Sequence, residues 1–169
     1  MSRPPAVLGL FWTLLKLLVV ANLLFGAFVV AALIATFAAP QPLVALLGSP
    51  AASASVIDGL RLLAAIGILS VPLSHLVLTR LVAIVETVRD GDPFVEANAH
   101  RLGTMAWALF GLEGLHLGSI LVAVATSDAT GEIDWSFSIA GWLAVLLLFV
   151  LARVFEEGAR MRYELEGTI

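Results

Sequence analysis

Four long apolar stretches, separated by shorter polar segments, dominate the pattern of residues along the chain. They cover about residues 10–37, 60–78, 102–126 and 139–154. A helix needs roughly 20 predominantly apolar residues to cross the hydrocarbon core of a bilayer. The pattern therefore predicts an all-α polytopic membrane protein, a four-helix bundle that forms a single domain over residues 1–169.

Two of these helical patterns continue past the membrane, where apolar and charged residues alternate at helical spacing. After the second span the pattern reaches Arg89 and then the sequence Asp90-Gly91-Asp92-Pro93. Gly91 suits the left-handed C-cap of one helix, and Asp92 with Pro93 suits the first turn of the next. Residues 79–101 are thus predicted to form a helical hairpin. Residues 155–169 continue the fourth helix as an amphipathic tail with a Glu156–Arg160 pair.

The basic residues predict which way the chain crosses the membrane. Nine Lys and Arg residues occur, and Arg61 alone lies on one side of the predicted membrane while the other eight lie on the opposite side. The other eight are Arg3, Lys16, Arg80, Arg89, Arg101, Arg153, Arg160 and Arg162. Because basic residues accumulate in cytoplasmic segments, both termini, the hairpin 79–101 and the tail 155–169 are predicted to face the cytoplasm.

Composition narrows the function. The chain is 60% hydrophobic and only 13% charged, so a lipid bilayer is its first expected partner. A net charge of −4 argues against direct binding of nucleic acid. There are no cysteines, and no metalloprotease, nucleophile-elbow, phosphate-loop or dinucleotide motif occurs. We therefore expect no catalytic residues, no metal site, no cofactor and no enzyme activity.

Polar residues inside the predicted spans are candidates for function, because ionisable groups are costly in lipid. Glu113 lies near the middle of the third span, with His116 one turn away, Asn22 at a similar depth and His75 nearer the inner edge. One interpretation is a proton-coupled or ion-sensing site. The other is a protonated Glu113 that hydrogen-bonds to Asn22 or His116 and holds the helices together. Lys16 is expected to extend its side chain toward the membrane surface.

Gly114 and Gly118 form a GxxxG pattern in the third span. Small residues at this spacing allow two helices to approach closely. The pattern predicts either packing between spans of one chain or a homo-oligomer.

Two segments resemble the signatures of a bacterial membrane family known as domain of unknown function 2975. The first comprises Asp90, Gly91, Asp92, Pro93, Phe94, Asn98 and Arg101, and the second includes Phe155, Glu156, Gly158 and Leu165. The resemblance implies a multi-pass protein of the bacterial cytoplasmic (inner) membrane with no established activity. In many bacteria such proteins are encoded beside a small helix-turn-helix transcription regulator.

The resemblance and the helical extensions together favour a regulatory protein whose two signature segments bind a cytoplasmic partner such as that transcription regulator. The alternative is a transporter or channel component that uses Glu113 and His116.

Overall fold

The computed structural model describes residues 6–42, 54–126 and 138–166. Four long helices account for most of these residues, and no strand occurs among them. The helices are α1 (Ala6–Ala38), α3 (Ala54–Arg89), α4 (Glu96–Thr126) and α5 (Ile139–Glu166). Each is long and apolar enough to cross a membrane, which confirms the all-α, four-span prediction.

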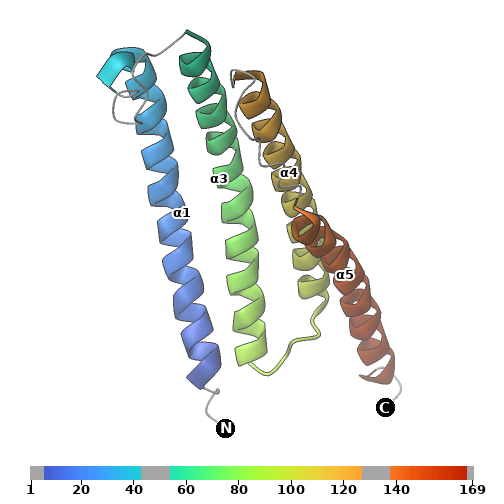
Figure 1. The fold of residues 1–169 in the computed structure, drawn as a ribbon. Helices are drawn as coiled ribbons and strands as arrows, with labels where there is room; N and C mark the ends of the chain where they lie inside the picture. Colours follow the sequence, from blue (N-terminus) through green and yellow to red (C-terminus); the bar gives the residue numbers. More distant parts are fainter. Residues whose placement is uncertain (1–5, 43–53, 127–137, 167–169) are drawn as a thin grey trace.

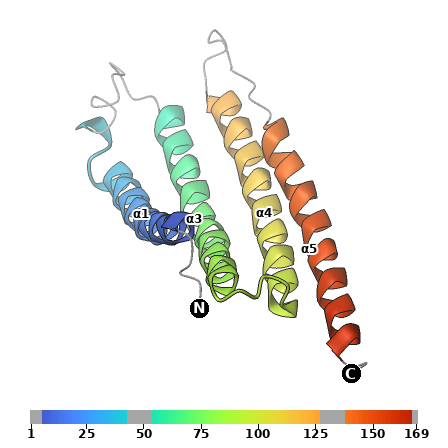
Figure 2. The same ribbon diagram turned by 90° about the horizontal axis from the view of Figure 1, so that it is seen from below.

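The helices form an open row (Figures 1 and 2), so the prediction of a four-helix bundle is wrong. The extensive contacts among the described residues join α1 to α3, α3 to α4, and α4 to α5, so each long helix packs mainly on its neighbours in the chain. As a result few apolar side chains of the described residues are buried by protein. They are Leu15, Val29, Leu102, Met105, Ala106, Ala108 and Val145. Lipid tails solvate apolar side chains as well as other side chains do, so the row needs no closed core.

Small residues bring α1 and α3 together. A Cβ added at Gly26 would lie 3.0 Å from a methyl group of Val71, and one at Gly67 would lie 3.1 Å from a methyl group of Val29. At the same contact the side-chain amide of Asn22 donates to the Val71 carbonyl at 3.2 Å. Close approach combined with one buried polar contact is a common way to pair helices in lipid.

The spacing of charged residues along α3 matches a bilayer. Arg61, which pairs with Asp58 at 3.0 Å, marks one level, and Arg80 marks the other. These two arginines are about 28 Å apart at the rise of an α-helix. The hydrocarbon core of a typical bilayer is about 30 Å thick. The segment between Arg61 and Arg80 therefore has the length of the hydrocarbon-embedded part of the protein.

Basic residues of neighbouring helices lie near the level of Arg80. Arg101 on α4 donates to a carbonyl of α3 that is about one turn from Arg80. Lys16 on α1 lies one turn from Trp12, whose indole N–H donates to an α3 carboxylate at 3.0 Å. The start of α1, the α3–α4 hairpin and the end of α5 share this end of the molecule, which we call the hairpin end (Figure 1). The predicted cytoplasmic location of this end remains a prediction.

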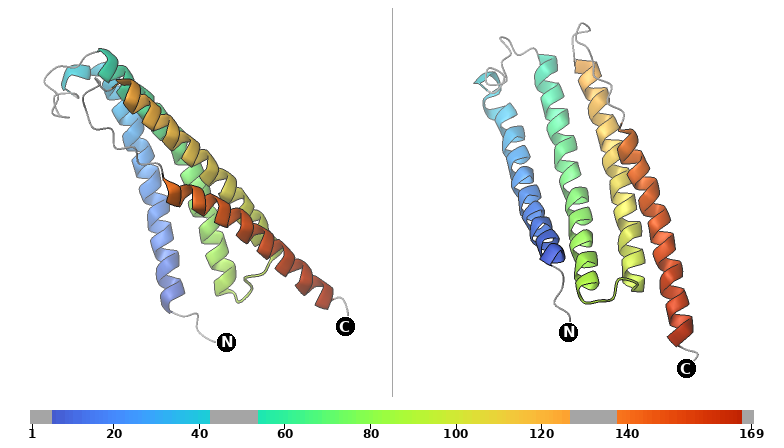
Figure 3. Two further views of the ribbon diagram at one scale, coloured as in Figure 1. Left: turned by 45° about the vertical axis from the view of Figure 1, so that its right-hand side comes forward. Right: turned by 60° about the horizontal axis from the view of Figure 1, so that its bottom comes forward.

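α5 begins well short of the far end of α4 (Figure 3). Its first turn packs beside Glu113, because a Cβ added at Gly141 would overlap the Glu113 carboxyl group. α4 continues from Glu113 to Thr126, a further distance of about 20 Å. The start of α5 therefore lies at mid-depth of α4. Residues 127–137, which connect these two helices, lie outside the described residues.

Candidate functional site

The α3–α4 turn is built on one left-handed glycine. Gly91 has a φ of 86°. The Asp92 N–H donates to the Thr87 carbonyl at 2.9 Å, and the Gly91 N–H donates to the Val88 carbonyl at 3.2 Å. This pair of bonds is a Schellman motif, which satisfies the carbonyls left free at a helix end. The prediction of a left-handed C-cap at Gly91 is confirmed.

The prediction that Asp92 and Pro93 begin the next helix is wrong, because α4 begins at Glu96. Residues 92–95 are not helical. The Asp92 carboxylate does not cap α4 but forms an ion pair with Arg162 of α5. Tertiary contacts with α5 therefore override a good local signal for a helix start.

Asn98 holds this turn in place. Its side chain is 0% exposed. The side-chain amide donates to Thr87 Oγ1 at 2.7 Å and to the Pro93 carbonyl at 2.8 Å. Its Oδ1 accepts a hydrogen bond from Arg101 Nη1 at 2.7 Å. Asn98 thus links α3, the turn and α4, and its contribution to any binding surface is to position the turn.

The Phe94 side chain packs the turn against α5. Its ring centroid lies 5.2 Å from that of Phe155. A Cβ added at Gly158 would lie 3.3 Å from Phe94 Cδ1, so any larger residue there would push the aromatic ring aside by a few tenths of an ångström. Together with the Asp92–Arg162 ion pair, this contact packs the two signature segments against each other.

An open groove of about 590 Å³ lies beside this contact, and we call it the hairpin groove. Its lining residues are Asp92, Phe94, Val95, Glu96, Glu156, Ala159, Arg160, Arg162 and Tyr163. Phe94 is 47% exposed and Tyr163 is 80% exposed. The groove therefore offers aromatic surface between side chains of both charge signs. Leu165 belongs to α5, but its side chain lies outside the described part.

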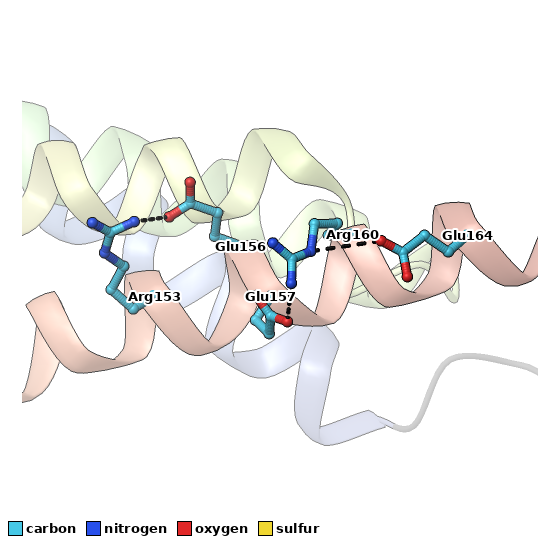
Figure 4. A network of polar contacts seen from close by, with 5 residues as sticks. All are labelled: Arg153, Glu156, Glu157, Arg160 and Glu164. Carbon is cyan, nitrogen blue, oxygen red and sulfur yellow. Dashed lines mark hydrogen bonds and ion pairs between the residues drawn. The ribbon is translucent and has the colours of Figure 1, made fainter.

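Charged residues along α5 pair with one another within the helix (Figure 4). Arg153 pairs with Glu156 at 2.8 Å, and Arg160 pairs with Glu157 at 2.6 Å and Glu164 at 3.7 Å. The predicted Glu156–Arg160 pair is not formed, since Glu156 turns toward Arg153. Exposed pairs of this kind contribute about 0–1 kcal/mol each, so they add little to the stability of the protein.

The intramembrane polar residues do not gather into one site. Asn22 bonds to α3, whereas Glu113 faces α5, and α3 stands between α1 and α4. Asn22 is one of the two predicted hydrogen-bond partners of Glu113. The hydrogen bond between them is therefore not formed. Oε2 of Glu113 and Nδ1 of His75 are buried and have no hydrogen-bond partner among the described residues. His116 lies on the same helix as Glu113. No group of three metal-binding side chains occurs in the described segments.

The GxxxG residues make little close contact within the chain. A Cβ added at Gly118 would meet Ile66 of α3 at 3.8 Å, which is ordinary van der Waals contact. A Cβ added at Gly114 would meet nothing within 4 Å. The motif is therefore not a tight helix–helix contact inside this chain, and a homo-oligomer through it stays a prediction.

Fold and site together define a class: a four-span helical membrane protein whose hairpin is joined to its C-terminal helix outside the apolar segments. The chain belongs to the family described as "Protein of unknown function (DUF2975)", whose model matches residues 50–169. The match covers α3, α4, α5 and both signature segments, and it confirms the resemblance seen in the sequence. No curated protein and no solved structure matches the chain.

Proposed function

We propose that this protein is a non-catalytic regulatory protein of the bacterial inner membrane that binds a cytoplasmic partner in the hairpin groove. The partner proposed is a helix-turn-helix transcription regulator. The observation that carries the proposal is that residues of both signature segments line one open groove at the hairpin end: Asp92 and Phe94 from the first segment and Glu156 from the second.

Exposed apolar groups at this end support binding of a protein. Tyr163 lies about 15 Å along α5 beyond Arg153, so the hydrocarbon core does not cover it. Its side chain and that of Phe94 present aromatic surface beside Arg160 and Glu96. Tyrosine and arginine are enriched among the residues that contribute most to protein–protein affinity.

The shape and charge of the groove favour a helical segment as the bound element. An amphipathic helix binds by laying its apolar side into a groove between packed helices. The groove carries charges of both signs, negative at Glu96 and Glu156 and positive at Arg160 and Arg162. Complementary charges on the partner would set its register and its association rate.

The test is a binding measurement between the full chain in lipid nanodiscs and the helix-turn-helix regulator encoded beside its gene. Tyr163→Asp places a charge in the groove and is expected to weaken binding at least thirtyfold, the size of a loss of about 2 kcal/mol. Met161→Asp is the matched control, since Met161 is 52% exposed on the same helix but does not line the groove. Equal affinity of the wild type and the Tyr163 variant would contradict the proposal.

A second candidate is a transporter or channel component, and one observation favours it. The Glu113 carboxyl group lies at mid-depth beside the first turn of α5. Helix ends within the membrane are typical of ion and substrate sites in secondary transporters. This candidate predicts that reconstituted vesicles conduct protons or a solute and that Glu113→Gln abolishes the flux. Flux no greater than that of protein-free vesicles would remove it.

A further inference from the structure

Trp12 of α1 is surrounded by charged side chains from two helices. Lys16 Nζ lies 3.7 Å from the centroid of the Trp12 ring, and the Arg89 guanidinium carbon lies 5.2 Å from it. The indole N–H donates to Glu86 Oε1 at 3.0 Å. A cation over an indole face is held by the negative charge of the ring's π system. One indole ring at the α1–α3 contact therefore contacts two cations, one from each helix.

Positive charge at this cluster is not balanced by ion pairs. Within the described residues neither Lys16 nor Arg89 forms a salt bridge, whereas Arg61, Arg153, Arg160 and Arg162 all do. Nε of Arg89 is buried without a hydrogen-bond partner among the described residues. The carboxylate of Glu86 is exposed and bonds to the indole. The cluster thus keeps an excess of one positive charge and unused donors.

The depth of the cluster indicates what neutralises it. The backbone of Lys16 lies near the level of Arg80, where the hydrocarbon-length segment of α3 ends. Its side-chain amine reaches the ring of Trp12, which lies one helical turn nearer the hairpin end. The Lys16 side chain therefore points along α1 toward the hairpin end, which is the direction expected from the sequence. The site therefore lies in the layer of lipid headgroups, where tryptophan is enriched. Phe11 and Leu14 of the same segment are exposed apolar side chains.

We propose that Lys16, Arg89 and Trp12 form a binding site for the headgroup of an anionic phospholipid. The lysine amine and the arginine guanidinium donate hydrogen bonds to the phosphate, and Trp12 positions both cations at the membrane surface. A guanidinium binds phosphate through two parallel hydrogen bonds, which a lysine alone cannot provide. The site is separate from the hairpin groove, which is formed by the turn and α5.

The experiment measures binding of phosphatidylglycerol and phosphatidylcholine to the full chain in a neutral detergent by native mass spectrometry. Each basic residue near the surface adds about fivefold to the affinity for anionic lipid. The double variant Lys16→Gln/Arg89→Gln is expected to bind phosphatidylglycerol about 25-fold more weakly. The charge-preserving double variant Lys16→Arg/Arg89→Lys should retain at least a third of the wild-type affinity, which separates loss of charge from misfolding.

The matched control is Arg61→Gln/Arg153→Gln, which removes the same net charge from residues that already have carboxylate partners. It should leave phosphatidylglycerol binding within twofold of wild type. An equal loss in this control, or equal binding of phosphatidylcholine to the wild type, would overturn the proposal. Displacement of the lipid by soluble glycerol phosphate at equal concentration would also overturn it, because the site would then be one for free phosphate.

Discussion

Replacing Asn98 with alanine tests the central structural statement about the hairpin, that one buried amide holds the turn. The substitution removes the two hydrogen bonds donated by the side chain and the one it accepts from Arg101. The Pro93 carbonyl and the Thr87 hydroxyl lose this partner. Because the site is fully buried, water does not replace these bonds without rearrangement of the turn.

The expected magnitude follows from these contacts. Each neutral hydrogen bond contributes about 1 kcal/mol, and a bond to a charged group contributes about 1.5–3 kcal/mol. Arg101 keeps a weaker bond to the Ala83 carbonyl at 3.4 Å, which reduces the loss. We expect Asn98→Ala to lower the free energy of opening the hairpin by about 3 kcal/mol.

Hydrogen exchange of the protein in nanodiscs, read by mass spectrometry, measures this opening. A loss of about 3 kcal/mol accelerates exchange more than a hundredfold at the amides of Gly91 and Asp92, which donate to α3 carbonyls. His100→Ala is the control, because His100 is exposed on the same helix. It should change the exchange less than threefold.

Two results would refute this reasoning. One is exchange in the Asn98 variant within threefold of wild type. The other is an equal acceleration in the His100 control, which would show that α4 is sensitive to any substitution. A double-mutant cycle with Thr87→Val adds a direct test, since Thr87 Oγ1 accepts from Asn98 and the two effects should not be additive.

Three further predictions concern backbone space and charge. Gly91→Ala places a side chain at a φ of 86° and should destabilise the turn by about 1–2 kcal/mol, measured as faster exchange of the hairpin amides. Gly141→Ala puts a Cβ onto the Glu113 carboxyl group of α4 and should lower the melting temperature in detergent. Gly114→Ala puts a Cβ into open space and should leave the melting temperature unchanged, so equal melting temperatures of the two variants would contradict this prediction. The Asp92–Arg162 pair is 41% and 49% exposed, so Asp92→Ala should cost less than about 1 kcal/mol, and the cost should vanish in 1 M salt.

Local features of the candidate site were predictable from the sequence. The left-handed Gly91 follows from a glycine placed directly after a helical pattern. The partners of the turn were not predictable. Asp92 forms an ion pair with Arg162, and Asn98 forms a hydrogen bond with Thr87. Both partners come from other parts of the chain, and a single sequence has no signal for such pairs. The same holds for Tyr163, whose role in the groove depends on how the turn meets α5.

The start of α4 shows how tertiary contacts override a local pattern. Asp92 and Pro93 favour a new helix directly after the turn, yet residues 92–95 are not helical. A non-helical segment lets Phe94 pack on α5 and lets Asp92 pair with Arg162. Phe94, named from the sequence as a binding residue, is therefore also a packing residue.

The number, approximate extent and membrane-spanning character of the helices could be predicted from the residues of each segment, because span length and apolarity do not depend on the rest of the chain. Contacts between helices show three things that the sequence did not predict: the helices stand in a row, α5 begins at mid-depth of α4 beside Glu113, and the two signature segments meet. In lipid, apolar helices gain little from hiding one another, so their order and register depend on small residues and a few polar contacts between distant positions.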